Sequence, residues 1–227
     1  MKKTLNSTFT FLLVIITSIS YSQNNDIEIN SKIDTISYCL GLSFGRSMKS
    51  EGIDKINIVF FAKAITDIFN NEKLLFEPLR ADQILSEYIM NLRREKAEIN
   101  LKAGQEFLEN NKNKEGVITL PSGLQYKVLR KGTGLSPKLT DKVTVHYHGT
   151  LIDETVFDSS FERGNPIQFS VNGVINGWTE ALQLMKVGAK WKLFIPANLA
   201  YGENVPKGSK IEPNMVLIFE VELLSIE

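Results

Sequence analysis

The 227-residue sequence has one cysteine and no excess of either charge. With only Cys39 available, no disulfide can form within the chain. A lone cysteine is usually a small buried apolar residue, and an intermolecular disulfide is the alternative. The 26 basic and 26 acidic residues cancel, so the net charge gives no electrostatic reason to expect a nucleic-acid partner.

Long apolar runs are equally scarce, and the exception lies at the N-terminus. Two lysines precede the apolar run from Phe9 to Ile19, and Ser20 to Ser22 then offer a cleavage site. This pattern is typical of a secretory signal, and the run is too short to span a bilayer comfortably. We therefore expect a signal peptide over residues 1–22 and a flexible leader over 23–30, with an uncleaved anchor as the alternative.

Three segments after the leader have the apolar spacing of helices. The first runs from the capping pair Ser31 and Asp34 toward Gly52, the second from near Asn57 to Asn70, and the third from Pro78 to about Asn111. A helix of that last extent would be about 50 Å long at 1.5 Å per residue. Its second half is mostly charged, which favours a solvent-exposed arm between two domains.

The first two predicted helices are short and make a poor core alone. Small helical units of this kind are commonly completed by a second subunit. We therefore expect residues 31–115 to form a helical dimerisation domain with its connecting helix. A compact monomeric helical domain is the alternative.

Beyond Gly116 the apolar pattern changes to the alternation of strands. A short helix, Trp178–Val187, is expected among them, with Gly188 at its C-terminal end. These elements predict an α+β domain over residues 116–227, in which a curved antiparallel sheet wraps around the helix. The expected strands are Gly123–Val128, Lys142–Gly149, Ile167–Val171, Lys190–Ile195 and Val216–Leu224.

The only two histidines, His146 and His148, alternate on one of these strands and share a face. Two imidazoles on one face could begin a metal site. No third ligand is suitably placed in the sequence, so surface strand residues are the preferred interpretation and no metal is expected.

Four short segments contain the main candidate residues for a binding site. They are Val145–Gly149, Val156–Ser160, Val174–Trp178 and Ala200–Gly202, and they bring Tyr, Phe, Asp, Val, Ile and Trp from separate parts of the chain. No nucleophile–base pair or phosphate-binding loop accompanies them. Such residues suit a small apolar pocket that desolvates a group and offers it a few hydrogen bonds.

These segments carry a family resemblance. The stretch from about Gly123 to Glu227 resembles the FKBP-type peptidyl-prolyl cis-trans isomerase domain. Residues 33–113, including Tyr38-Cys39-Leu40-Gly41, are similar to the helical N-terminal domain of the secreted bacterial macrophage infectivity potentiator and FkpA-like group. The resemblance implies an FKBP-like fold preceded by an all-α domain, and an isomerase without a cofactor.

The resemblance also implies roles for individual residues. Trp178 would form the pocket floor, Tyr201 would donate its hydroxyl to a substrate carbonyl, and Asp158 would orient groups at the rim with Arg163 or Tyr147. Taken alone, such residues are more often core aromatics, turn aspartates or loop tyrosines. The implied catalytic residues are Asp158, Tyr201, Phe157 and Trp178, and the implied substrate-binding residues are Tyr147, Phe169, Val174, Ile175, Ile211 and Phe219.

The function that follows is isomerisation of X-Pro bonds during folding of exported proteins in the bacterial envelope. The alternative is a dimeric holdase chaperone that binds unfolded chains, with catalysis secondary. The implied partners are proline-containing peptides, unfolded exported proteins and a second copy of the chain, and a macrolide is a candidate inhibitor. The expected location is the periplasm, with association with the outer membrane left open.

Overall fold

The computed structural model describes residues 28–206 and 208–227. The predicted signal peptide over 1–22 lies outside them, as does the predicted leader except for residues 28–30, which are exposed and have no regular structure. The chain divides into two compact units, residues 1–44 and 45–227, and each is considered by itself.

Helix α1 (Lys32–Ser50) begins at the predicted capping pair, because the Asp34 amide donates to Ser31 Oγ at 3.1 Å. None of its residues is buried within the single chain. Cys39 is exposed there, so the prediction of a buried cysteine is wrong.

Helices α2 (Ile58–Phe69) and α3 (Pro78–Asn111) begin where the sequence predicts. Asn57 caps α2, its Oδ1 accepting from the Val59 amide at 3.0 Å. Asn71, with φ of 54°, follows the end of α2, and a left-handed residue there stops the helix. Pro78 occupies the first turn of α3, where its missing N–H has no helical acceptor to lose.

The second half of α3 corrects a prediction. We expected a solvent-exposed arm, yet Ala97, Gly104 and Asn111 are buried, and the ring of Phe107 lies 6.0 Å from that of Phe194 on the sheet. A few small or amide residues at helical spacing are enough to dock one face of α3. The charged side chains cover the other faces, which is why the composition alone indicated exposure.

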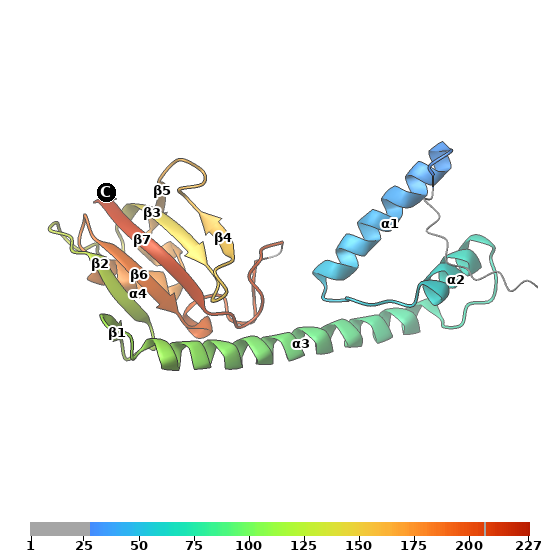
Figure 1. Cartoon of the computed structure of the whole chain (residues 1–227), viewed down its shortest axis with the longest axis horizontal. Helices are drawn as coiled ribbons and strands as arrows, with labels where there is room; N and C mark the ends of the chain where they lie inside the picture. The colour runs from blue at the N-terminus through green and yellow to red at the C-terminus, as the bar shows by residue number, and fades with distance from the viewer. Residues whose placement is uncertain (1–27, 207) are drawn as a thin grey trace, which may run out of the picture. The chain divides into compact units, whose positions relative to one another are not determined.

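One antiparallel sheet dominates the second unit (Figure 1). Within the described residues its order is β1-β2-β6-β7-β3-β4, with β5 paired to β3 beyond that path. β1 and β4, of three and four residues, were not predicted as strands. The strands are β1 (Val117–Thr119), β2 (Gln125–Arg130), β3 (Lys142–Thr150), β4 (Val156–Ser159), β5 (Ile167–Ser170), β6 (Lys190–Ile195) and β7 (Leu217–Ile226).

Helix α4 (Asn176–Leu184) starts two residues before the predicted position and stops three residues earlier than predicted. Gly188 is therefore not its cap. With φ of 89° it makes the turn into β6, where its amide donates to the Leu223 carbonyl at 2.8 Å. Trp178, Ala181 and Leu182 are the buried face of α4, and they join the core beneath the sheet.

Strand β3 pairs with three other strands, β4, β5 and β7. Val143, Val145 and Tyr147 alternate on its buried face. The predicted fold class is confirmed, since a curved antiparallel sheet packs on one short helix and follows a helical N-terminal region. In the described part of the chain, no helix is long and apolar enough to cross a membrane.

Candidate functional site

Five aromatic rings from five elements meet at the start of α4. The ring of Trp178 lies 5.3 Å from Tyr147, 5.2 Å from Phe219 and 5.6 Å from Phe169, each nearly edge-on. Phe157 joins through Phe219 at 5.3 Å. Edge-to-face contacts of this kind are the favoured geometry of aromatic pairs. They hold the cluster in a fixed shape whose surface is apolar.

Gly149 lets this cluster close, and the sequence reasoning gave it no role. It pairs with Phe219 on one side of β3 and with Asp158 on the other. A Cβ at this position would lie 2.7 Å from Cζ of Phe157 and 3.0 Å from Cε1 of Phe219. Only a residue without a side chain allows both rings to approach the strand. A glycine inside a strand was the available signal, since it often marks such an approach.

A polar trio borders the aromatic rings. The Tyr147 hydroxyl donates to Asp158 Oδ2 at 2.5 Å, and Arg163 Nη2 donates to the same hydroxyl oxygen at 2.7 Å. Arg163 Nη1 donates to Asp158 Oδ1, closing an ion pair. The expected association of Asp158 with Arg163 and Tyr147 is therefore present in the structure.

The trio shifts the ionisation of its members. Burial pushes the pKa of Asp158 upward, but the hydrogen bonds from Tyr147 and Arg163 outweigh it, so the pKa lies below its usual value. Burial, and then the bond to Asp158, raise the pKa of Tyr147. At neutral pH the site thus combines a fixed carboxylate with an un-ionised phenol.

Ser160 anchors Tyr147 by its backbone, a role that the sequence reasoning also missed. The Tyr147 amide donates to Ser160 Oγ at 2.8 Å, and the Ser160 amide donates to the Tyr147 carbonyl at 3.0 Å. Ser160 is fully buried. Its hydroxyl fixes the segment after β4 against β3, which keeps Asp158 beside the ring it bonds.

The other predicted residues lie on loops around the cluster. Val174 and Ile175 pack against the core just before α4, and Ile211 is buried in it. Ile175 is the N-cap residue of α4, where backbone N–H groups and the helix dipole favour acceptors. Tyr201 is 37% exposed, and burial, followed by the nearby charge of Asp158, raises its pKa.

Both histidines have hydrogen-bond partners. Nδ1 of His146 lies 2.9 Å from Ser160 Oγ, and Nδ1 of His148 lies 3.1 Å from Ser159 Oγ. Across residues 28–206 and 208–227, no group of three or more His, Cys, Asp or Glu side chains could hold a metal ion.

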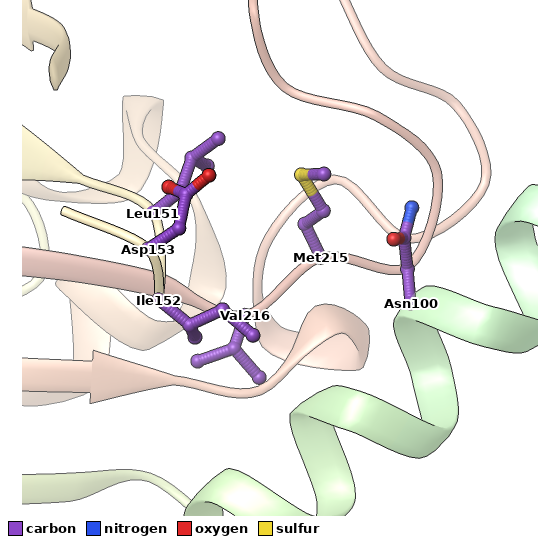
Figure 2. A pocket seen from close by; sticks show the side chains of 6 residues that line it. All are labelled: Asn100, Leu151, Ile152, Asp153, Met215 and Val216. Atoms are coloured by element: carbon purple, nitrogen blue, oxygen red, sulfur yellow. The ribbon is translucent and has the colours of Figure 1, made fainter. Parts of the chain in front are cut away.

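A separate pocket of about 220 Å³ lies away from the aromatic rings, beside α3 (Figure 2). Figure 2 shows Asn100 reaching from α3 toward the loop of Met215, with Asp153 on the opposite wall. None of the predicted site residues lines this pocket. Its lining residues are Asn100, Leu151, Ile152, Asp153, Met215 and Val216.

The fold and the site define a class of protein before any comparison is made. An α+β domain presents a rigid aromatic surface with a carboxylate and two phenols at its border, which suits a domain that binds an apolar group of a peptide. Two family models match the chain. One, described as FKBP-type peptidyl-prolyl cis-trans isomerase, matches residues 134–224. The other, described as the domain amino-terminal to it, matches 33–128.

Similar proteins agree with these matches. The chain is 44% identical to "Outer membrane protein MIP" of Legionella longbeachae, over 86% of this chain and 85% of that protein. It is 44% identical to the FKBP-type 22 kDa peptidyl-prolyl cis-trans isomerase of Escherichia coli, over 84% and 93%. The crystal structure of FkpA from Escherichia coli superposes with a TM-score of 0.64 at 35% identity, covering 88% of this chain and 99% of that one.

The chain therefore belongs to the FKBP-type peptidyl-prolyl cis-trans isomerases. It is a rotamase enzyme, and its substrates are proline-containing peptides.

Proposed function

We propose that the chain isomerises X-Pro bonds at the aromatic cluster formed by Tyr147, Phe157, Phe169, Trp178 and Phe219, and that it does so during the folding of exported proteins. The observation that carries the proposal is the edge-on packing of Trp178 against three of these rings. This packing supports an apolar aromatic surface at the start of α4, against which a proline ring can rest.

The chemistry needs no covalent step. Rotation about an X-Pro bond is slow because amide resonance must be lost, at a barrier of about 18–20 kcal/mol. The twisted amide is less polar than the planar one, so an apolar, water-poor surface favours the transition state over the ground state. Binding that stabilises the twisted form more than either planar isomer is sufficient for catalysis.

In this proposal the substrate is held by the aromatic cluster and by residues of the surrounding loops. The proline ring rests on Trp178, with Val174 and Ile211 at its edges. The backbone amide of Ile175, at the N-terminus of α4, bonds the substrate main chain. The hydroxyl of Tyr201 donates to a substrate carbonyl, and its raised pKa keeps it protonated.

Asp158 acts in this scheme through charge and position. Each of its oxygens already accepts a hydrogen bond from Tyr147 or Arg163. A carboxylate has further lone pairs, and its lowered pKa keeps it ionised. Asp158 therefore fixes the ring of Tyr147 and holds negative charge at the border of the cluster, where the substrate amide twists.

The test is a prolyl-peptide isomerisation assay on the full chain and on Trp178→Leu, with far-ultraviolet circular dichroism as the folding check. Leucine retains an apolar side chain but removes the flat surface. We expect catalysis to fall by at least tenfold in a folded protein. A folded Trp178→Leu variant with full activity would refute the placement of the site.

Export and envelope location are part of the proposal. They are supported by the sequence pattern of residues 1–22 and by the name of the Legionella relative, an outer membrane protein. Fractionation of cells that express the chain with and without residues 1–22 tests this, since only the full chain should leave the cytoplasm.

A second copy of the chain is the partner we propose for the helical region. Apolar side chains that the single chain leaves exposed recur on α1, α2 and the first half of α3, and soluble monomers rarely expose such extended apolar surface. A homodimer would cover them, and two isomerase domains in one particle would bind unfolded chains with avidity. Holdase activity and macrolide binding remain secondary proposals. The exposed residues include Ile33, Ile36, Leu40, Ile58, Phe60, Ile65, Ile68, Leu79 and Leu85.

A further inference from the structure

The segment 211–216, which carries Ile211 into the core cluster, is fastened to α3 at several points. Asn100 Nδ2 donates to the Pro213 carbonyl at 2.9 Å, and Asn214 Nδ2 donates back to the Ala97 carbonyl at 3.4 Å. Two amide side chains thus bridge helix and segment in opposite directions. An ion pair between Lys96 and Glu212 lies beside them.

One turn further along α3, the helix touches the same segment directly. A Cβ on Gly104 would lie 2.7 Å from Cγ2 of Val216. Gly104 therefore allows the helix backbone to approach Val216 more closely than any other residue would. Glycine costs about 1 kcal/mol in a helix interior relative to alanine, and the close approach is the physical reason for its presence.

The segment is also linked to the loop of Tyr201. The Asn214 amide donates to the Gly202 carbonyl at 2.8 Å, immediately after Tyr201. Asn214 has φ of 58°, a left-handed conformation that asparagine tolerates better than most residues. Asn214 therefore joins Ala97 on α3 to Gly202, the residue that follows Tyr201.

Packing alone does not hold this segment on every side. The pocket of about 220 Å³ separates Asn100 and Met215 from residues 151–153 (Figure 2). A segment that borders an open space has fewer packing contacts to define its position. Its hydrogen bonds to α3 then carry more of the positioning.

We propose that Asn100 is a positioning residue of the isomerase site: through Pro213 and Asn214, α3 holds Ile211 and Tyr201 at the aromatic cluster. The connecting helix is then part of the substrate site and not only a link to the helical region. This inference rests on the function proposed above for Ile211 and Tyr201.

The test uses the full chain with two variants that remove the bridge from either side. Asn100→Ala removes the bond to Pro213. Asn214→Gly removes the bond to Ala97 and keeps the left-handed backbone, which glycine adopts without strain, so this variant should fold even if the first does not. Asn110→Ala is the matched control, because Asn110 is an exposed asparagine on the same helix.

The measurement is kcat and KM for a proline-containing tetrapeptide, at a temperature where circular dichroism finds every variant folded. Loss of one hydrogen bond predicts a rise in KM of roughly two- to tenfold for both bridge variants. We expect kcat to stay near that of the wild type and Asn110→Ala to change neither constant. Unchanged KM in folded Asn100→Ala and Asn214→Gly would overturn the proposal.

A double-mutant cycle with Tyr201→Phe separates this inference from the proposed function. If α3 positions Tyr201, removing the hydroxyl should matter less in the Asn100→Ala background than in the Asn110→Ala background. Additive effects of Tyr201→Phe and Asn100→Ala would contradict positioning of Tyr201 by α3. If Tyr201→Phe alone has no effect, the role proposed for Tyr201 fails, while a raised KM in Asn100→Ala would still support positioning through Ile211.

Discussion

Asp158 is the carboxylate at the border of the aromatic cluster, held by Tyr147 and Arg163. Its pKa lies below the usual value because hydrogen bonds from Tyr147 and Arg163 outweigh the effect of burial. A carboxylate with a depressed folded-state pKa stabilises the fold above its unfolded-state pKa of about 3.9. That stabilisation is lost as the pH falls through the folded-state pKa.

The prediction concerns the stability of Asp158→Asn against that of the wild type as the pH changes. The difference in their unfolding midpoints should be nearly constant from about pH 5 to pH 7 and should shrink below about pH 4, because the carboxylate of the unfolded chain becomes protonated there while that of the folded chain stays ionised until a lower pH. Chemical denaturation at a series of pH values measures it. In an Arg163→Gln background the same substitution should have a smaller effect, and a difference that grew toward low pH would contradict the assignment.

Tyr201 offers a test of catalysis with little effect on the fold, because its side chain is partly exposed. Tyr201→Phe should lower kcat/KM by up to about tenfold, since a hydrogen bond between neutral groups contributes about 0.5–1.5 kcal/mol. Tyr126→Phe is the control, because Tyr126 stacks on Trp191 at 4.2 Å, outside the aromatic cluster of the site. Equal losses in the two variants would point to a general effect of removing a phenol.

Gly149 should be intolerant of even the smallest side chain. Gly149→Ala places a methyl group against the rings of Phe157 and Phe219, and overpacking of this kind typically costs about 1–3 kcal/mol. We expect a lower unfolding midpoint together with reduced peptide activity. Gly173→Ala is the matched control, since its nearest contact would be Ser170 Cβ at 3.6 Å, an ordinary distance.

At the scale of the elements, helix α3 and the sheet belong to one folded body. Asn111 Nδ2 donates to Gln125 Oε1 at 2.9 Å, and Gln125 Nε2 donates to the Leu108 carbonyl at 2.9 Å. Both side chains are buried. Cutting the chain at Gly116 would leave Gln125 without either partner, and an unpaired buried polar group is costly.

A comparison of two fragments tests this. Residues 116–227 should still fold and isomerise short peptides, because the strands and α4 complete the aromatic cluster, but with a raised KM because the hydrogen bonds of Asn100 and Ala97 to residues 213 and 214 are absent. A fragment that starts at Arg94 should unfold at a higher temperature, since it restores the contacts of Ala97, Gly104 and Asn111. Calorimetry measures the unfolding temperature of each fragment. Equal temperatures would mean that the docked half of α3 adds no stability.

The sequence predicted the elements with long, regular patterns and missed the short or context-dependent ones. The capping pair Ser31 and Asp34 and the first-turn proline Pro78 placed the starts of α1 and α3, because such signals are local chemistry. β1 and β4 were missed because they are short and are defined by their pairing with β2 and β3. Gly104 was given no role, because its close approach to Val216 joins two residues that are distant in sequence.

Some residues of the candidate site were predicted from the sequence, and others were not. Its aromatic residues and Asp158 were named from the family resemblance, and the structure brings them together. Gly149 and Ser160 were not named, because their contribution is to let rings approach and to fasten one strand to the next. Such roles exist only once the register of β3 with β4 and β7 is known, and one sequence does not reveal register between distant strands.

At the scale of the whole molecule, the question is what covers the apolar side chains of the helices. Ile36 and Leu40 lie one turn apart on α1 and are 44% and 54% exposed in the single chain. No residue of α1 is buried there. A closed symmetric pair is the commonest way for a chain to cover a surface of its own, so we expect the full chain to be a dimer at micromolar concentration.

Replacing Ile36 and Leu40 together by aspartate should give a monomer, because charges cannot be buried unpaired in an apolar interface. The matched control is Leu135→Asp, which changes a leucine that is 82% exposed on the isomerase domain and should leave the dimer intact. Light scattering gives the mass of each variant. Peptide isomerisation should be unchanged in the monomer, because no residue of the aromatic cluster is touched, whereas refolding of a proline-limited protein should slow as avidity is lost. A wild-type chain that is monomeric at micromolar concentration would contradict this proposal and leave the exposed apolar side chains of α1 without an explanation.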